Sequence, residues 1–210
     1  MNKQNLFFAI VGPSGVGKNT IIDGVNAKLK EAGLQTLDLL TTATTRAKRE
    51  GEIENVHHFF LTPEEFKRRQ ESGDFLEVSH PHGRSYGTLK DTFHVQLSQT
   101  PLVKDIDATG AMSIKQNVPS ICRTILLMPP SIKALAERLE GRGADANRLE
   151  AALSVGPDLQ ACLQGNTDKP FTSEDLKGSR LGNYSMLFWN ETLEITIQKV
   201  YNYVCKELGY

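Results

Sequence analysis

The chain has 210 residues, enough for one substantial hydrophobic core, and its 39% hydrophobic and 23% charged residues are ordinary for a folded globular protein. The formal net charge of −1 gives no overall attraction to nucleic acid or to an anionic membrane, so any phosphate site must come from locally placed Lys and Arg. The three cysteines are widely spaced and include no CxxC pair, which argues against a disulfide framework or a zinc site. We therefore expect a cytoplasmic protein that binds neither nucleic acid nor membrane.

The first elements in chain order are a strand, a glycine-rich turn and a helix. The unbroken apolar run from Leu6 to Val11 is typical of a strand buried on both faces of a parallel sheet, and it is too short for a membrane span. After the turn, Ile21, Val25 and Leu29 share one face of a helix that Gly33 can end. This order is the first half of a βαβ unit.

The stretch 41–90 differs in composition from what surrounds it. A short strand is predicted at 36–40, and the chain then becomes polar and rich in Arg and His. One helical pattern appears at 63–72, where Thr62 can serve as the N-cap. We interpret 41–90 as an inserted substrate-binding region.

The chain after residue 100 alternates predicted strands and helices. An apolar strand at 101–107 ends on two carboxylates, and a Pro-Pro-Ser sequence at 129–131 introduces a helix that Gly141 ends. Residues 155–183 lack periodicity, which predicts a long loop or lid. The remaining predicted strands and helix lie at 123–128, 185–189 and 193–208. This alternation implies an α/β fold with a doubly wound parallel sheet.

The glycine-rich turn matches the phosphate-loop pattern G-x-x-x-x-G-K at Gly12, Gly17 and Lys18. Its backbone N–H groups can form an anion nest, the following helix adds its positive end, and Lys18 can reach the terminal phosphates of ATP. Asn19 stands where a Ser or Thr hydroxyl usually ligates Mg²⁺, so Mg²⁺ is expected with ATP but no protein ligand is assigned to it. The residues assigned to ATP in this loop are Gly12, Ser14, Gly15, Gly17, Lys18, Asn19 and Thr20.

The sequence TATTRAKREGE at 42–52 resembles the guanylate kinase signature S-x-T-T-R-x-P-R-x-G-E. Further matching stretches follow in the same order, with HFF at 58–60, FLE at 75–77, YGT at 86–88, DID at 105–107 and PPS at 129–131. The resemblance implies a P-loop nucleoside monophosphate kinase. Its expected parts are a P-loop core at 1–40 and 91–210, a lid within about 142–183, and a GMP-binding region at 41–90.

The resemblance also implies the residues that bind the acceptor. A monophosphate carries a doubly charged head, for which Arg46 and Arg49 can supply planar guanidinium groups. Tyr86 matches a family tyrosine of this cluster, and His58 stands where the family has a second one. A carboxylate suits the N1–H and N2–H₂ groups of guanine, and Glu77 occupies that position. The further GMP-binding positions are Thr42, Thr88 and Asp107.

Charged residues near the ends of two core elements complete the predicted site. Asp105 and Asp107 follow a buried strand, where open α/β sheets bind ligands, and they can organise Mg²⁺ through water or orient the acceptor. Arg138 and Arg142 lie four residues apart on one helical face. They resemble the family arginines at the ATP base and the transferring phosphoryl group, and Asn190 resembles an asparagine near the adenine. The catalytic set is Lys18, Arg46, Asp105 and Arg142.

The expected function is Mg-ATP-dependent phosphorylation of GMP to GDP in purine nucleotide metabolism, with dGMP as an open second acceptor and the oligomeric state also open. One alternative is a ribose bisphosphate kinase, which the guanine-matching residue Glu77 disfavours. The other is a catalytically weak guanylate-kinase-like binding module. Asn19 and His58 depart from the family pattern, and Leu153 stands where the resemblance implies a further arginine when the residues are counted without gaps. These departures favour such a module, whereas the intact Lys18 opposes it.

Overall fold

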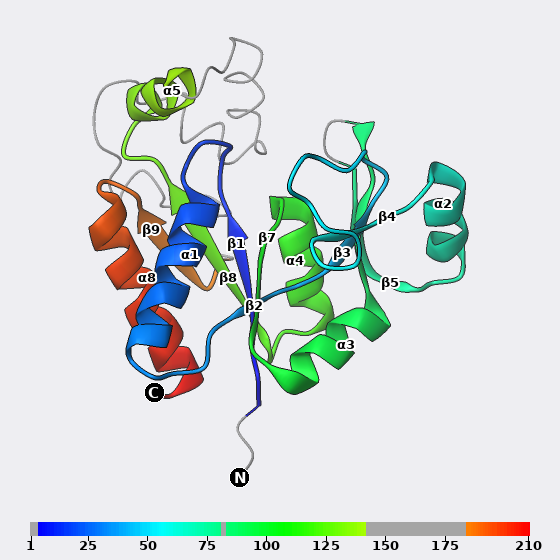
Figure 1. Cartoon of the computed structure of the whole chain (residues 1–210), viewed down its shortest axis with the longest axis horizontal. Coiled ribbons are helices and arrows are strands. Elements are labelled where there is room, and N and C mark those ends of the chain that lie inside the picture. Colours follow the sequence, from blue (N-terminus) through cyan, green and yellow to red (C-terminus); the bar gives the residue numbers. More distant parts are fainter. Residues whose placement is uncertain (1–3, 81–82, 142–183) are drawn as a thin grey trace. The chain divides into compact units, whose positions relative to one another are not determined.

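The computed structural model describes residues 4–80, 83–141 and 184–210 (Figure 1). The predicted lid at 142–183 therefore lies outside the described residues. The chain divides into two compact units, which we call unit 1 (Met1–Ala9 and Leu34–Arg123) and unit 2 (Ile10–Gly33 and Thr124–Tyr210). Within the described ranges, no helix is both long enough and apolar enough to cross a bilayer.

The larger sheet has five strands in the order β2-β7-β1-β8-β9. These are β1 (Phe7–Val11), β2 (Asp38–Leu39), β7 (Leu102–Asp105), β8 (Cys122–Met128) and β9 (Met186–Trp189). The pairs β2–β7 and β8–β9 are parallel, and every residue of β1 is buried, as predicted from its unbroken apolar run. The α/β fold with a mostly parallel sheet is confirmed, although the strand predicted at 36–40 is only two residues long.

Unit 2 contains the helices α1 (Lys18–Glu31), α5 (Ile132–Glu140) and α8 (Leu193–Leu208). α1 and α8 lie side by side (Figure 1), and the absence of a side chain at Gly24 allows their close approach. A Cβ atom at Gly24 would lie 2.4 Å from Cδ1 of Ile197 on α8. α5 begins after Ser131, whose hydroxyl accepts a hydrogen bond from the Ala134 backbone N–H, and it ends at Gly141 as predicted.

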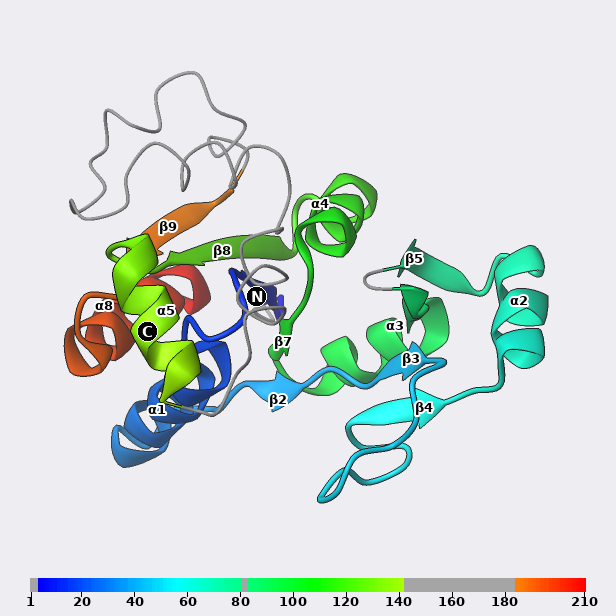
Figure 2. The ribbon, with the colours of Figure 1, turned by 90° about the horizontal axis from the view of Figure 1, so that it is seen from above.

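A four-stranded sheet in unit 1 has the order β4-β3-β6-β5. Its strands are β3 (Thr42–Thr44), β4 (His58–Phe60), β5 (Phe75–Ser79) and β6 (Tyr86–Leu89). Helix α2 (Pro63–Glu71) connects β4 to β5 (Figure 2), and the Thr62 hydroxyl accepts from the Glu65 backbone N–H as predicted. Phe66 of α2 stacks on Phe75 with ring centroids 4.6 Å apart, which fixes the helix to the sheet.

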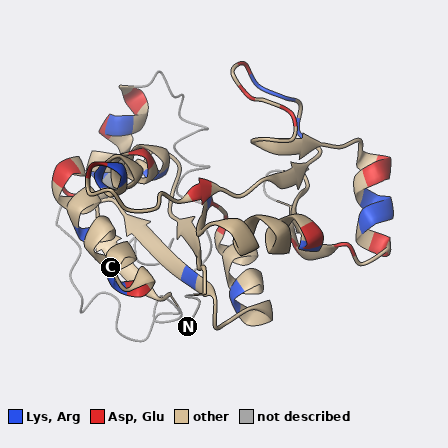
Figure 3. Ribbon diagram, turned by 60° about the horizontal axis from the view of Figure 1, so that its bottom comes forward, with Lys and Arg blue, Asp and Glu red and all other residues tan. Residues whose placement is uncertain are grey.

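Helix α2 carries charged residues of both signs (Figure 3). Glu65 lies 3.3 Å from Arg69, and Lys67 lies 3.8 Å from Glu71. Exposed pairs of this spacing contribute only about 0.3–0.5 kcal/mol each. Because Phe66 is almost fully buried, its packing rather than these ion pairs holds α2 in place.

Unit 1 also contains α3 (Lys90–Gln99) and α4 (Ala108–Asn117), two helices that the sequence analysis did not predict. The strand predicted at 101–107 ends at Asp105. Asp107 is instead the N-cap of α4, because its carboxylate accepts the Gly110 backbone N–H at 3.0 Å. Asp105 therefore ends a strand whereas Asp107 begins a helix, and the prediction that both carboxylates end the same strand is wrong.

Candidate functional site

The glycine-rich loop of unit 2 has the backbone that an anion nest requires. Gly12, Gly15 and Gly17 have φ angles of +153°, +85° and +98°, values that L side chains rarely adopt. Gly17 is the N-cap of α1, no side chain caps this helix end, and the first turn contains no acidic residue. The first backbone N–H groups of α1 are thus suited to bind an anion.

Lys18 lies over this loop. Its ammonium group donates to the backbone oxygens of Gly12 at 2.9 Å and of Pro13 at 3.3 Å. The positive charge is therefore held at the mouth of the nest, where an anion would be attracted to both. The predicted loop residues Ser14, Asn19 and Thr20 are exposed, with Asn19 and Thr20 in the first turn of α1.

Two of the residues predicted for ATP meet beside the loop. Asn190 is buried, and its side-chain N–H donates to the Val16 backbone oxygen at 2.7 Å. Arg138 donates to the backbone oxygen of Asn190 at 2.8 Å. A Cβ atom at Gly17 would lie 3.1 Å from the Asn190 side-chain nitrogen, so Asn190 packs closely against the loop and supports it. Arg142 and Leu153 lie outside the described residues.

A substitution at Gly12 tests how closely the loop packs against the neighbouring backbone. A Cβ atom there would lie 2.4 Å from the backbone oxygen of Leu127, so Gly12→Ala combines a forbidden φ with a backbone clash. We expect the free energy of unfolding to fall by about 3 kcal/mol or more, measured by urea denaturation. Gly33→Ala is the control: its φ is +68° and nothing lies within 4 Å of the added atom, so the loss should be about 1 kcal/mol. Equal losses would contradict the close approach at Gly12.

The two arginines predicted for the acceptor phosphate behave differently in unit 1. Arg46 is buried and forms a two-pronged ion pair with Glu52, with Nη1–Oε2 and Nη2–Oε1 distances of 2.7 and 2.6 Å. Glu52 Oε2 also accepts the Arg49 backbone N–H at 2.7 Å, while the Arg49 side chain is exposed. The hydrogen bonds from Arg46 lower the pKa of Glu52 to about 2, against the opposing effect of burial. Glu52 thus fixes the turn that carries both arginines.

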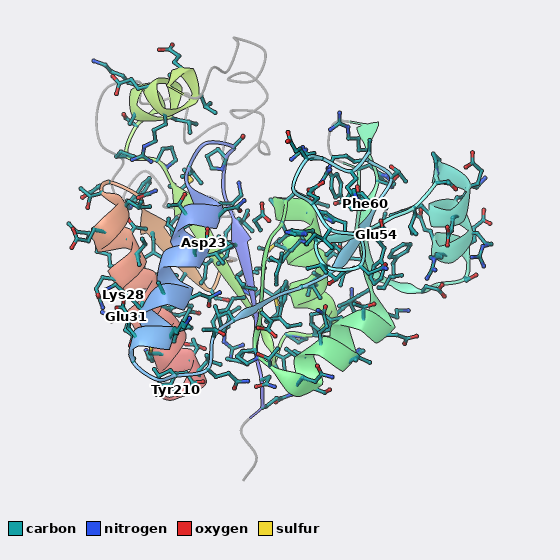
Figure 4. The ribbon with its side chains drawn as sticks, in the orientation of Figure 1. Asp23, Lys28, Glu31, Glu54, Phe60 and Tyr210 are labelled. Carbon is teal, nitrogen blue, oxygen red and sulfur yellow. The ribbon has the colours of Figure 1, made fainter. Side chains whose placement is uncertain are left out.

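His58 lies among the other residues predicted for the acceptor. Its Nδ1 is 2.9 Å from the Thr42 hydroxyl, and its ring centroid is 6.2 Å from that of Tyr86. The Arg46 guanidinium carbon lies 5.6 Å from the ring centroid of Phe60, the last residue of β4 (Figure 4). Burial, with further repulsion from cationic side chains, lowers the pKa of His58 to about 4. The imidazole is therefore neutral at physiological pH.

Glu77 is the buried acid of unit 1, with only 5% of its surface exposed. Its Oε1 accepts the Thr88 hydroxyl at 2.8 Å, while its Oε2 has no hydrogen-bond partner in the described chain. Burial, helped by the charge of Asp107, raises the pKa of Glu77 to about 7, although the Thr88 hydrogen bond acts the other way. The carboxylate is thus positioned beside a hydroxyl with one oxygen left for a ligand.

Three residues that contact the predicted acceptor residues were not themselves predicted from the sequence. Ser79, which shares the Glu77 face of β5, donates to Asp107 at 2.6 Å, so alternation along the strand could have identified it. A Cβ atom at Gly110 would lie 3.0 Å from Glu77 Oε2, and this proximity had no signal in the sequence. Glu52 is part of the quoted signature, and its charge next to two arginines was the available signal.

Comparisons with known proteins show which family the chain is similar to. The family model described as guanylate kinase matches residues 5–155. The guanylate kinase of Idiomarina loihiensis is 30% identical over 203 residues, which cover 96% of this chain and 94% of the relative. That of Clostridium acetobutylicum is 37% identical over 149 residues, 70% of this chain and 68% of the relative. The crystal structure of guanylate kinase from Anaplasma phagocytophilum matches with a TM-score of 0.65 at 21% identity, covering 99% of this chain and 88% of that one. This match shows that the two chains share a fold.

Proposed function

The chain belongs to the guanylate kinase family and is an enzyme of that kind, and from this premise we propose that it transfers the γ-phosphoryl group of Mg-ATP to GMP. The products are ADP and GDP, and dGMP is a second acceptor to be tested. The reaction requires the acceptor phosphate to meet the γ-phosphoryl group in line, without a covalent enzyme intermediate. Positioning and charge neutralisation are then the whole task of the protein.

The unpartnered oxygen of Glu77 is the observation that carries the GMP assignment. Guanine presents N1–H and N2–H₂ side by side, which are two donors for a carboxylate. A buried acceptor without a partner costs free energy, and a guanine ring would provide the missing hydrogen bonds. Adenine has an acceptor at N1, so it would face the carboxylate with a lone pair. Thr88 orients the carboxylate, and the Ser79–Asp107 pair lies beside it.

The acceptor phosphate is assigned to Arg46, Arg49, His58 and Tyr86. When the Thr42 hydroxyl donates to Nδ1 of His58, the proton of the neutral ring is on Nε2, which can donate to a phosphate oxygen. Arg46 and Glu52 form a fixed pair, so Arg49, whose side chain is exposed, is the residue that adjusts to the ligand.

On the donor side, the loop from Gly12 to Gly17 and Lys18 bind the phosphates of ATP. Asn19 offers an amide oxygen, which is a suitable type of ligand for Mg²⁺, and we assign the ion chiefly to the ATP phosphates. When bound, Mg²⁺ neutralises charge that develops on the transferring group. Arg138 and Arg142 are assigned to ATP and to the transferring phosphoryl group, and Asp105 to orientation of the acceptor.

Domain roles and location belong to the same proposal. Residues 41–90 form the GMP-binding region, which the four-stranded sheet supports, and residues 1–40 and 91–210 form the P-loop core with a lid within about 142–183. The reaction belongs to purine nucleotide metabolism, and the cytoplasm is the location that we propose for it.

An acceptor panel tests the proposal. With Mg-ATP and coupled detection of ADP, we expect kcat/KM for GMP to exceed that for AMP by about 10⁴-fold, because AMP leaves the buried carboxylate unpaired. Equal ADP release with and without GMP would contradict guanylate kinase activity. Preference for a ribose bisphosphate would favour the sugar-phosphate alternative.

The pKa of Glu77 predicts a pH dependence of guanine binding. Only the ionised carboxylate accepts both guanine donors, and its pKa in the empty protein is about 7. Below that pH, binding must remove a proton, so affinity for guanosine should fall about tenfold per pH unit, as measured by calorimetry from pH 8 to pH 5.5. Guanosine is used because it has no titrating phosphate. Glu77→Gln is the control and should bind weakly at every pH; a flat wild-type profile would contradict the assignment.

A further inference from the structure

Lys104 is a buried lysine to which the proposed mechanism gives no role. It lies within β7, after the fully or almost fully buried residues Leu102 and Val103, and only 5% of its own surface is exposed. Burying an ammonium group is costly unless it is paired with hydrogen-bond acceptors or negative charge. A lysine at this position therefore needs an explanation beyond core packing.

The Lys104 ammonium lies next to the predicted acceptor-phosphate residues. It donates to the backbone oxygen of His57 at 3.1 Å, and His57 immediately precedes His58 at the start of β4. A lysine ammonium has three N–H donors, and within the described chain this is the one hydrogen bond assigned to it. The group is thus anchored at one donor, with two left for a ligand.

The charges around this position leave the phosphate site short of cations. Arg46 is neutralised by Glu52 at 2.6 Å, and His58 is neutral because it is buried. Arg49 is then the single uncompensated cation among the residues assigned to a doubly charged phosphate. Burial lowers the pKa of Lys104 to about 8, Asp105 and Glu52 oppose this shift, and Arg46 adds to it, so these four groups act on one another.

We propose that Lys104 is a phosphate-binding residue of the acceptor site, whose ammonium binds the 5′-phosphate of the nucleoside monophosphate. It supplies the positive charge that the neutral His58 does not. The inference rests on the proposed function, because it takes the phosphate of GMP as the ligand. A purely structural role is the competing explanation, in which Lys104 only holds the His57 carbonyl.

The affinity ratio of GMP to guanosine distinguishes these roles, because the two ligands differ only in the phosphate. In Lys104→Met we expect the dissociation constant for GMP to rise by about tenfold or more, the usual loss for one charge-assisted hydrogen bond. The dissociation constant for guanosine should not change. Lys104→Arg keeps the charge and should retain most of the wild-type preference for GMP over guanosine. Lys90→Met is the matched control, since Lys90 also donates to a backbone oxygen, that of Gly73, in unit 1 but is exposed.

Equal weakening of GMP and guanosine in Lys104→Met would show a structural role and overturn the proposal, as would no change in either. Should neither variant fold, the wild type provides the test by amine-reactive labelling and mass spectrometry. GMP, but not guanosine, should slow the labelling of Lys104; equal protection by both ligands would overturn the proposal. A wild type that does not prefer GMP to AMP refutes the proposed function itself, whereas a GMP-selective wild type with an unchanged Lys104→Met variant refutes only this inference.

Discussion

Lys18→Met is expected to lower kcat/KM for ATP by about 10²–10³-fold, the usual loss when one group that stabilises transition-state charge is removed. The lysine ammonium lies 2.9 Å from the Gly12 backbone oxygen, over a loop with three glycines at positive φ. Methionine fills a similar volume but has no charge, so the nest remains while its fixed cation is lost. Steady-state ADP release at saturating GMP measures the effect.

Lys28→Met is the matched control for this variant. Lys28 lies in the last turn of the same helix α1 (Figure 4), about 15 Å along the axis from Lys18. Its removal should leave kcat/KM for ATP within about twofold of the wild type, because its charge is too far from the loop to act on the phosphates. If Lys18→Met retained turnover within tenfold of this control, the assignment of the loop to ATP would be wrong.

Glu77→Gln is expected to reduce kcat/KM for GMP by about 10²–10⁴-fold. Two charge-assisted hydrogen bonds to guanine, each worth about 1.5–3 kcal/mol, are replaced by one neutral bond and an opposed N–H₂ group. The free energy of unfolding should not decrease, because the buried carboxylate already has a raised pKa and a neutral amide of the same shape avoids the cost of burying a charge. Activity and stability thus move independently, which separates a binding role from a structural one.

The ratio of GMP to AMP activity provides the second measurement on this variant. The GMP-to-AMP ratio should fall together with kcat/KM for GMP, since the neutral amide no longer discriminates between guanine and adenine by charge. Glu71→Gln is the matched control: Glu71 is an exposed acid at the end of α2 in unit 1, and its side chain is 68% exposed. An unchanged GMP-to-AMP ratio in Glu77→Gln would show that base selection lies elsewhere.

Most of the fold was predictable because local patterns specify it. The apolar run of β1, the Thr62 cap of α2 and the helix at 193–208 depend on residues close in sequence, and the structure confirms all three. α3 and α4 were missed since their apolar residues are few. α4 begins at an Asp N-cap that the sequence analysis assigned to the end of a strand.

The chemistry of the phosphate loop was likewise determined by the sequence, because Gly12, Gly17 and Lys18 lie within one turn and act through their own backbone and charge. Tertiary structure decided the contacts that join distant residues. Asn190 supports Val16 across 174 positions, and Lys104 reaches His57 across 47. Such contacts depend on which elements lie next to one another, and the hydrophobic periodicity of one segment does not identify the distant segment that it packs against. Burial, and with it the pKa values of Glu77 and His58, followed only from that packing.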